Sequence, residues 1–219
     1  MPDLKACLFD LDGVIVDTAR FHYIAWRELA NGLSFELTEE QNEQLKGIGR
    51  MESLDIILKI GNVKLDAETK KKLAAKKNDR YLELCQEMTP ENILPGVQVF
   101  LDSLIQEKIK IGLGSASKNA RLILDYIGLT HYFAAIVDGN RITKGKPDPE
   151  TFLLGAEDLE TKPANSLVFE DAVAGIHAAK AGGMKAVGIG GSAELKAAGA
   201  DLVIPGFQDI DVSTVKRLF

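Results

Sequence analysis

Cysteine is scarce in this chain, with only Cys7 and Cys85 among 219 residues. Cys7 lies in an apolar stretch near the start and Cys85 in a helical pattern far along the chain, so neither disulfide pairing nor zinc-ligand spacing is evident. We read both as small core residues. No apolar run approaches the roughly 20 residues needed to cross a membrane, and the first residues show no basic and apolar leader. We therefore expect a globular cytoplasmic protein that does not act at a membrane.

Basic residues are fewer than acidic ones, and the formal net charge is -6 at pH 7. The lysines are scattered or clustered on one helical stretch without interleaved aromatic residues, which argues against a nucleic-acid partner. The composition is otherwise ordinary, with 46% hydrophobic and 26% charged residues. A chain of this length can bury a sizeable core. An acidic protein that handles phosphate must concentrate its cations locally, and this is the pattern to look for.

The order of expected elements divides the chain into two parts. Residues 17–90 show only helical signals, including a capping box at Thr38 and a stop at Asn31-Gly32. From about residue 92 strands and helices alternate, and a first strand is expected at residues 6–9. Such alternation predicts an α/β fold with a doubly wound parallel sheet. We therefore expect a sheet domain over residues 1–15 and 92–219, interrupted by an inserted all-helical cap domain over residues 16–91.

Two carboxylates follow the first expected strand directly. Residues two apart in an extended chain point to the same side, so Asp10 and Asp12 would face one point while Leu11 packs inward. Two anions held so close need a cation, a shared proton or a phosphorylated partner. An Asp-x-Asp-Gly sequence also occurs as an ordinary polar turn, so this stretch alone leaves both interpretations open.

Three further strand ends carry polar residues of the kind that phosphoryl transfer needs. These residues are Ser115, Lys146 and the pair Glu170-Asp171. Because ligands in such sheets bind beyond the carboxyl ends of the strands, we expect the four ends to form one site. Ser115 and Lys146 would hold phosphoryl oxygens. Each residue also has a plainer interpretation: Glu170 and Asp171 as helix caps, Lys146 as a turn residue, and Ser115 as a helix-entry residue.

The acids suggest a covalent mechanism with a metal ion. Asp10, Glu170 and Asp171 offer the hard oxygen ligands that Mg²⁺ prefers. With its charge partly neutralised, Asp10 can attack phosphorus and form an aspartyl phosphate. Asp12 can protonate the leaving oxygen and later deprotonate the acceptor.

The four motifs, in order, resemble those of the haloacid dehalogenase (HAD) superfamily, and the helical insert resembles its first type of cap. The residues that carry this resemblance are Asp10-Leu11-Asp12-Gly13, Ser115, Lys146-Pro147 and Glu170-Asp171. Within the superfamily, the chain is most similar to the β-phosphoglucomutase family. This likeness rests on Phe9 to Ile15, Asp17-Thr18-Ala19, His22, Trp26, Gln44 to Arg50, Lys77-Asn78-Asp79 and Ser115 to Asn119. Members interconvert β-glucose 1-phosphate and glucose 6-phosphate, with one Mg²⁺ per active site and glucose 1,6-bisphosphate as the priming intermediate.

The resemblance implies a role for each matching residue. It makes Asp10 the nucleophile, Asp12 the general acid and base, and Asp10, the main chain of Asp12, Glu170 and Asp171 the magnesium site. It places the transferring phosphate on Ser115, Ala116 and Lys146, and the other phosphate on Arg50, Ser117, Lys118 and Asn119. The cap residues that it assigns to substrate are His22, Trp26, Lys46, Gly47 and Lys77, with Thr18 at the hinge. Two departures from the family pattern are Gly114, where alanine is common, and Gly49, where serine is common.

Alternatives remain open at this point. A lone histidine such as His22 is more often a surface or half-buried residue than a catalytic one, and Trp26 also suits packing. The same core with water as acceptor would be a sugar-phosphate phosphatase. A non-catalytic phosphate-binding module is a further interpretation, although binding alone gains nothing from two adjacent anions. For the phosphoglucomutase interpretation we expect a small sugar-phosphate substrate as partner and a monomer.

Overall fold

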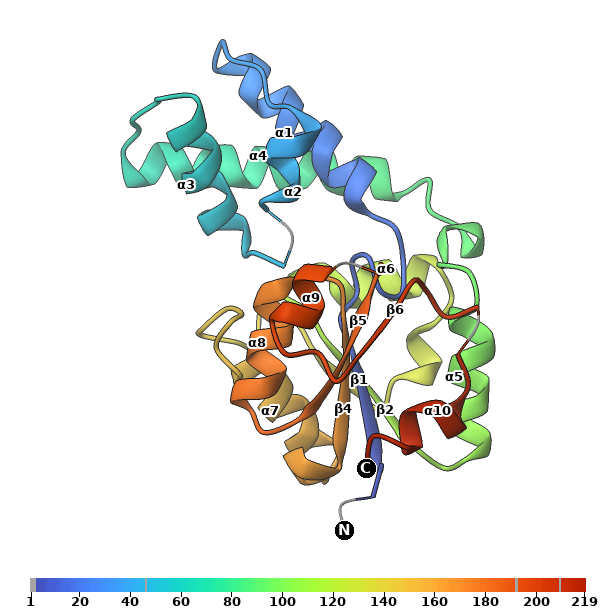
Figure 1. The fold of residues 1–219 in the computed structure, drawn as a ribbon. Coiled ribbons are helices and arrows are strands. Elements are labelled where there is room, and N and C mark those ends of the chain that lie inside the picture. The colour runs from blue at the N-terminus through green and yellow to red at the C-terminus, as the bar shows by residue number, and fades with distance from the viewer. Residues whose placement is uncertain (1–2, 46, 192, 209) are drawn as a thin grey trace. The chain divides into compact units, whose positions relative to one another are not determined.

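The computed structural model describes residues 3–45, 47–191, 193–208 and 210–219. The chain forms two compact units, which we call the core unit (Met1–Asp17 and Thr89–Phe219) and the cap unit (Thr18–Met88; Figure 1). The predicted domain boundaries, after residues 15 and 91, differ from these by two and three residues. Val16 forms bridges with Asp12 and Ile93. These bridges tie residues 16 and 93 into the core unit.

The core unit contains one six-stranded parallel sheet. Its strands are β1 (Ala6–Phe9), β2 (Lys110–Gly114), β3 (Ala135–Val137), β4 (Ser166–Glu170), β5 (Lys185–Ile189) and β6 (Leu202–Ile204). They are arranged in the order β3-β2-β1-β4-β5-β6, so the strand order reverses beside β1. The predicted doubly wound parallel sheet is thus confirmed, and β1 lies at the position where ligands bind in such sheets.

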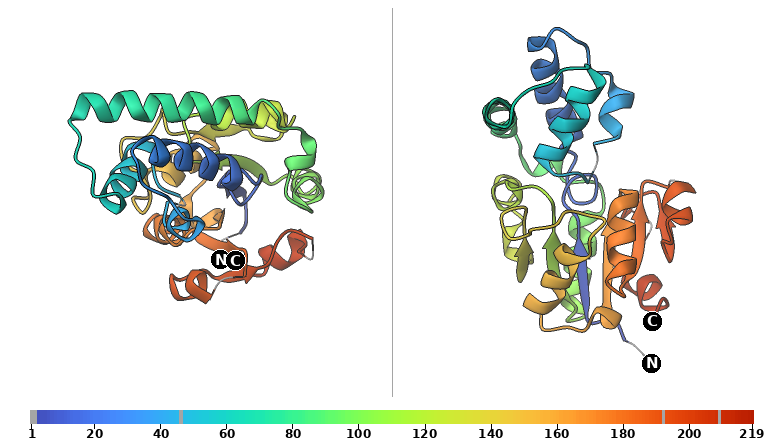
Figure 2. Two further views of the ribbon diagram at one scale, coloured as in Figure 1. Left: turned by 90° about the horizontal axis from the view of Figure 1, so that it is seen from above. Right: turned by 90° about the vertical axis from the view of Figure 1, so that its left-hand side faces the viewer.

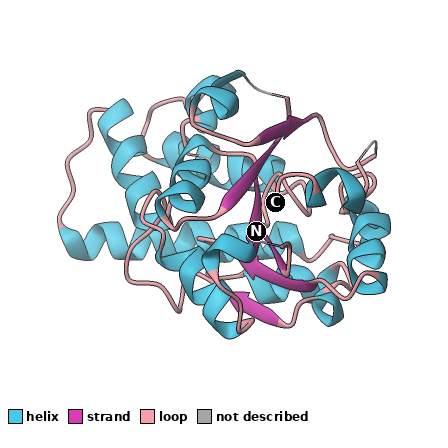
Figure 3. Ribbon diagram, turned by 60° about the horizontal axis from the view of Figure 1, so that its bottom comes forward, coloured by secondary structure: helices cyan, strands magenta, loops and turns pink. Residues whose placement is uncertain are grey.

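Helices cover both faces of this sheet, and Figure 3 shows them flanking the strands. The helices of the core unit are α5 (Val97–Gln106), α6 (Ala120–Tyr126), α7 (Glu150–Asp158), α8 (Val173–Ala181), α9 (Ala193–Ala197) and α10 (Val212–Lys216). Three short 3-10 helices, η1 (Pro90–Asn92), η2 (Thr130–Tyr132) and η3 (Pro163–Asn165), lie in the connections. Helices α7 and α8 lie on one face, and α5 and α10 on the other (Figures 1 and 2).

Strand β1 is buried on both faces, which explains its continuous apolar sequence. On one face Phe9 stacks on Phe169 of β4 with ring centroids 4.7 Å apart, and Phe100 of α5 meets both rings edge-on. On the other face Leu8 lies in the same buried cluster as Phe152 of α7. The residue that follows Phe9 therefore leaves a rigid, fully packed strand.

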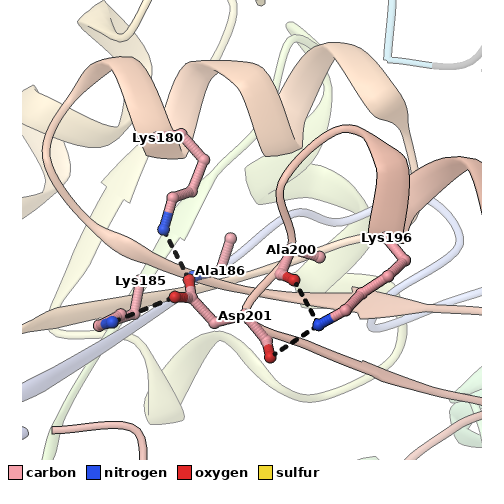
Figure 4. A network of polar contacts seen from close by, with 6 residues as sticks. All are labelled: Lys180, Lys185, Ala186, Lys196, Ala200 and Asp201. Atoms are coloured by element: carbon pink, nitrogen blue, oxygen red, sulfur yellow. Dashed lines mark hydrogen bonds and ion pairs between the residues drawn. The ribbon is translucent and has the colours of Figure 1, made fainter.

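A network of hydrogen bonds around the carboxylate of Asp201 stabilises the β6 side of the sheet, as Figure 4 shows. Asp201 accepts hydrogen bonds from Lys180 (2.7 Å), from Lys185 (3.1 Å) and from the main-chain N–H of Ala186 (2.9 Å). Lys196 donates to the main-chain carbonyl of Asp201. Burial alone would raise the pKa of Asp201, but these hydrogen bonds outweigh it and the pKa is lowered. The network joins α8, β5 and α9 to the start of β6.

Helices are the only regular secondary structure among the described residues of the cap unit. Its helices are α1 (Ala19–Gly32), α2 (Glu39–Glu43), α3 (Arg50–Ile60) and α4 (Ala67–Cys85). Figure 2 shows α4 as one unbroken helix, and it packs against α1 and α3. The capping box predicted at Thr38 is present, since Thr38 accepts from Gln41 N and Gln41 accepts from Thr38 N. Trp26, Leu54 and Ile57 lie in the hydrophobic core of this unit.

Local contacts mark the ends of two helices. The last cap helix, α4, ends at Cys85, where the chain turns and Met88 N donates to the Cys85 carbonyl. Pro149 is the N-cap residue of α7. Helix α10 was not predicted. No helix in the part of the chain that the structure describes is long and apolar enough to cross a membrane.

Candidate active site

The four strand ends singled out in the sequence carry buried polar side chains. Asp10 follows β1, Ser115 follows β2, Glu170 ends β4, and Lys146 lies in the loop between β3 and α7. The exposed fractions of these four residues are only 4%, 1%, 0% and 5%. The main chain joins the strand ends, because Asp10 N donates to the Phe169 carbonyl at 3.0 Å. Polar groups this deeply buried require partners.

Lys146 bridges two of the acids. Its Nζ lies 2.6 Å from Asp10 Oδ1 and 2.6 Å from Glu170 Oε1, and it lies over the ring of Phe152. The second oxygen of Glu170 accepts from the main-chain N–H of Ala172 at 2.7 Å. The Lys146–Pro147 peptide bond is cis. A group interpreted from sequence as a possible turn residue is thus the counter-ion of the candidate nucleophile.

The charge state of this cluster follows from its contacts. Burial alone would lower the pKa of Lys146, but the charges and hydrogen bonds of Asp10 and Glu170 outweigh it and the pKa is raised. Burial raises the pKa of Glu170, and the like charge of Asp10 adds to this effect while Lys146 opposes it. The ammonium is therefore retained at neutral pH.

Gly175 is a functional residue that the sequence analysis missed. It lies in the first turn of α8, and a Cβ atom there would overlap the carboxyl group of Glu170. Only glycine at this position leaves room for the Glu170 carboxyl group that contacts Lys146. A signal for it exists, since a glycine inside a helical pattern usually has a packing reason.

Gly175→Ala is expected to displace Glu170 and so loosen Lys146. Overpacking of this kind destabilises a fold by about 1 to 3 kcal/mol, and catalytic activity should fall as well because Lys146 loses a partner. Denaturant unfolding and steady-state rates measure the two effects. Gly32→Ala is the matched control, because a Cβ on that helical glycine meets no atom within 4 Å. Equal stabilities and equal steady-state rates for Gly175→Ala and Gly32→Ala would contradict the role given to Gly175.

Residues 115–119 form a compact loop after β2. Ser115 N donates to the Val137 carbonyl, and Ser115 Oγ accepts from Ser117 N at 3.1 Å. Ser117 Oγ accepts in turn from Asn119 N at 3.2 Å. Because the Ser115 oxygen accepts within the loop, its hydroxyl hydrogen can point to a ligand. Ala116, Ser117 and Asn119 are half-buried and Lys118 is exposed, so part of this loop is open to a ligand.

Gly114, the departure from the family pattern at the end of β2, has a packing explanation. A Cβ there would lie 2.8 Å from the ring of Phe152, over which the ammonium of Lys146 lies. Gly114 therefore makes room for the ring that supports the lysine.

The acids at the ends of β1 and β4 lie beside one another. Asp171 lies against Gly13, which has a positive φ of 79° and leaves room for the Asp171 carboxyl group. Asp12 is half-buried and bridges to Val16 in the same turn. The site thus holds Asp10 and Glu170 on the ammonium of Lys146. Asp12 lies two residues after Asp10 in the chain, and Asp171 directly follows Glu170.

This excess of negative charge and hard oxygen donors fits Mg²⁺. Within the described residues, no three His, Cys, Asp or Glu side chains are grouped closely enough to hold a metal ion by themselves. Glu170 already uses both oxygens, on Lys146 and on Ala172 N. Asp10 and Asp171 are therefore the better side-chain candidates for metal ligands, and the predicted ligand set stays a prediction.

In the cap unit, three of the predicted substrate residues form one cluster. Lys77 is 4% exposed, and its Nζ lies 2.8 Å from His22 Nδ1, 4.4 Å from the ring centroid of Trp26 and 4.9 Å from that of Tyr81. Burial, followed by the charges of Lys77 and Arg50, lowers the pKa of His22 well below its usual value. His22 is thus neutral, and because an ammonium can only donate, Nδ1 accepts and Nε2 carries the hydrogen.

Two aromatic residues belong to this cluster, and for Trp26 the sequence had left both packing and substrate contact open. Trp26 is 3% exposed and packs under the ammonium, so it supports Lys77 more than it offers a surface to a ligand. Tyr81 was missed, although it follows Lys77 by one helical turn and its ring stacks on His22 with centroids 4.1 Å apart. The i,i+4 spacing was the available signal.

The segment before and within α3 carries the remaining cap residues. Arg50 is the half-buried first residue of α3; burial lowers its pKa, which the charges of Asp79 and Tyr81 oppose. Gly49 is the N-cap and supplies no side-chain hydrogen bond, so this helix lacks the cap that a serine would give. Gly47 has a positive φ of 71°, and Lys46 lies outside the described residues.

Thr18 is fully buried and is the N-cap residue of α1, at the point where the core unit ends and the cap unit begins. Its carbonyl accepts from His22 N at 3.0 Å. The predicted hinge residue thus lies at a boundary between units.

The comparisons with known proteins agree with this geometry. The sequence profile of the haloacid dehalogenase-like hydrolases matches residues 4–183. The chain belongs to this haloacid dehalogenase-like family. It is 44% identical to "Beta-phosphoglucomutase" of Bacillus subtilis over 209 residues, which cover 94% of this chain and 92% of that protein. A crystal structure of β-phosphoglucomutase from Clostridium difficile has a TM-score of 0.94 and 42% identity, covering 98% of this chain and 96% of that one. The chain is also 31% identical to "Phosphorylated carbohydrates phosphatase" of Thermotoga maritima, over 84% of both chains.

Proposed function

We propose that this protein is a β-phosphoglucomutase, which interconverts β-glucose 1-phosphate and glucose 6-phosphate through an aspartyl phosphate and a bisphosphorylated glucose. The observation that carries the proposal is the buried contact of Lys146 with both Asp10 and Glu170. It supplies a fixed carboxylate nucleophile and a cation beside it. The 44% identity to the Bacillus subtilis enzyme supports the mutase reading over a simple phosphatase.

The core unit performs the transfer. Asp10 attacks phosphorus, the bond from phosphorus to the sugar oxygen breaks, and Asp12 gives that oxygen its proton. In the reverse direction Asp12 removes the proton from the acceptor hydroxyl, which then attacks the aspartyl phosphate. Lys146 and the Ser115 hydroxyl stabilise charge on the transferring phosphoryl oxygens. The rigid β1 strand holds Asp10 for this attack.

Asp10 and Asp171, with the main chain of Asp12, would hold Mg²⁺, and Glu170 would support the site through Lys146. The ion supplies charge stabilisation for the phosphoryl oxygens when it is bound. Lys146 already pairs with two carboxylates, those of Asp10 and Glu170, so a divalent cation would supply the further positive charge that the phosphate needs.

The second phosphate distinguishes a mutase from a phosphatase. Arg50, with Ser117, Lys118 and Asn119, would hold the phosphate that is not being transferred, and His22 and Lys77 would contact the sugar from the cap unit. A neutral His22 with hydrogen on Nε2 is suited to donate a hydrogen bond to a sugar oxygen. Holding both phosphates lets the bisphosphate rebind in either orientation while water is excluded.

The decisive measurement is a time course on β- and α-glucose 1-phosphate with Mg²⁺, scoring glucose 6-phosphate against free phosphate. We expect glucose 6-phosphate from the β anomer, little from the α anomer, and little free phosphate. Exhaustive chelation should remove the activity and added Mg²⁺ should restore it, since the carboxylates lose their counter-ion. Free phosphate as the main product would establish a phosphatase instead, and full turnover after chelation would refute the metal requirement.

A further inference from the structure

The segment at residues 138–140, which follows β3, lies directly against the loop that would hold the second phosphate. Gly139 N donates to the Ser117 carbonyl at 3.1 Å, continuing the pattern in which Ser115 N donates to the Val137 carbonyl. A Cβ on residue 139 would overlap the carbonyl oxygen of Ala116. The two main chains are therefore in contact beyond the ends of β2 and β3.

Asn140 supplies the side-chain link between the two segments. Its Nδ2 donates to the Lys118 carbonyl at 3.0 Å and to Asp138 Oδ2 at 3.0 Å, while its main-chain N–H donates to Asp138 Oδ1 at 2.9 Å. Both hydrogens of the amide group are thus used. The side chain joins the Lys118 main chain to a carboxylate that is itself tied to the Asn140 backbone.

The next residue anchors this arrangement to the sheet. Arg141 pairs with Asp158 at the end of α7 and donates to the Ile136 carbonyl of β3 at 3.1 Å. Its main-chain N–H donates to the Asp138 carbonyl at 3.0 Å. Asn140 is exposed to solvent, yet the chain on both sides of it is fixed, so its amide is presented in a constant position.

We propose that Asn140 is a positioning residue for the phosphate that is not being transferred: its amide fixes the main chain at Lys118 and thereby sets Ser117, Lys118 and Asn119. The proposal rests on the proposed function, because those three residues hold a second phosphate only in a mutase. It assigns Asn140 no part in the transfer itself, since Asp10 and Lys146 contact one another and Ser115 N is fixed by the Val137 carbonyl.

The test compares Asn140→Ala with Asn165→Ala. Asn165 is the matched control, because its Nδ2 also donates to a distant main-chain carbonyl, that of Asp3, in the connection before β4. Losing one hydrogen bond that acts in both ground and transition states should raise KM for β-glucose 1-phosphate by about five- to tenfold with little change in kcat. Phosphate release from acetyl phosphate, which needs only the core phosphate site, should stay at the wild-type rate in both variants.

Deuterium exchange of the main-chain amides at residues 115–121 gives a readout independent of activity. We expect faster exchange there in Asn140→Ala and unchanged exchange in β4. Equal loss of mutase and acetyl phosphate activities would overturn the proposal, as would an unchanged KM or unchanged exchange. If the wild type releases phosphate from acetyl phosphate but converts no β-glucose 1-phosphate, the proposed function fails, and the exchange result alone then decides whether Asn140 positions this loop.

Discussion

Asp10→Asn is expected to abolish turnover, with a loss of more than about 10³-fold, because an amide oxygen cannot serve as the nucleophile. The fold should persist. The buried cluster holds the carboxylates of Asp10 and Glu170 around the ammonium of Lys146, so removing one negative charge leaves a balanced pair of Glu170 and Lys146. The loss can therefore be read as chemical and not as unfolding.

Intact-protein mass after incubation with acetyl phosphate and Mg²⁺ measures this effect directly. The wild type should gain one phosphoryl group and Asp10→Asn none, with similar thermal unfolding midpoints. Asp3→Asn is the matched control, since Asp3 precedes the same strand and pairs with Lys5 in an exposed contact. A phosphorylated Asp10→Asn protein, or one that keeps the wild-type rate, would show that the nucleophile lies elsewhere.

Arg50→Ala is expected to lower mutase activity while leaving the formation of aspartyl phosphate from acetyl phosphate intact. Loss of a charge-assisted contact of about 1.5 to 3 kcal/mol should lower mutase kcat/KM by about 10- to 100-fold. Arginine is suited to binding the phosphate that is not transferred, because its planar guanidinium can donate two parallel hydrogen bonds to a phosphate. Aspartyl phosphate formation from acetyl phosphate should continue, since the groups assigned to it belong to the core unit.

The measurement is a pair of rates on one variant, mutase turnover and phosphate release from acetyl phosphate. Arg27→Ala serves as the control, because Arg27 is an exposed residue of α1 whose guanidinium lies over the Tyr23 ring. If Arg50→Ala leaves both rates unchanged, the second phosphate site is not at Arg50. If both rates fall together, the arginine acts through the core unit and the division of roles proposed here is wrong.

The sequence predicted the parts of the site that depend on strand ends. Asp10, Ser115 and Glu170 each follow or end a buried apolar strand, and parallel strands deliver such residues to one edge. That Lys146 would bridge Asp10 and Glu170 was not predicted, because it lies in a loop whose path depends on contacts far apart in the chain. The sequence assigned Lys146 to the phosphoryl oxygens but gave no sign of its contacts with the two acids.

Contacts between helices were harder to predict than strand ends. The space that Gly175 leaves for Glu170 depends on how α8 crosses β4, which no local pattern records. Helix α10 was missed although Asp211 caps it by accepting from Thr214 N. Its five residues are too few to show a helical period, whereas the longer cap helices displayed theirs clearly.

The strands at the two edges of the sheet are shorter than the strands between them. The edge strands β3 and β6 have three residues each, whereas the inner strands have four or five. Segments that template aggregation through strand pairing usually present five to seven consecutive residues, and short edge strands are one of the ways that proteins avoid it. Another chain that docked beside β3 or β6 would gain few main-chain hydrogen bonds. The protein is therefore expected to resist strand-mediated self-association at high concentration.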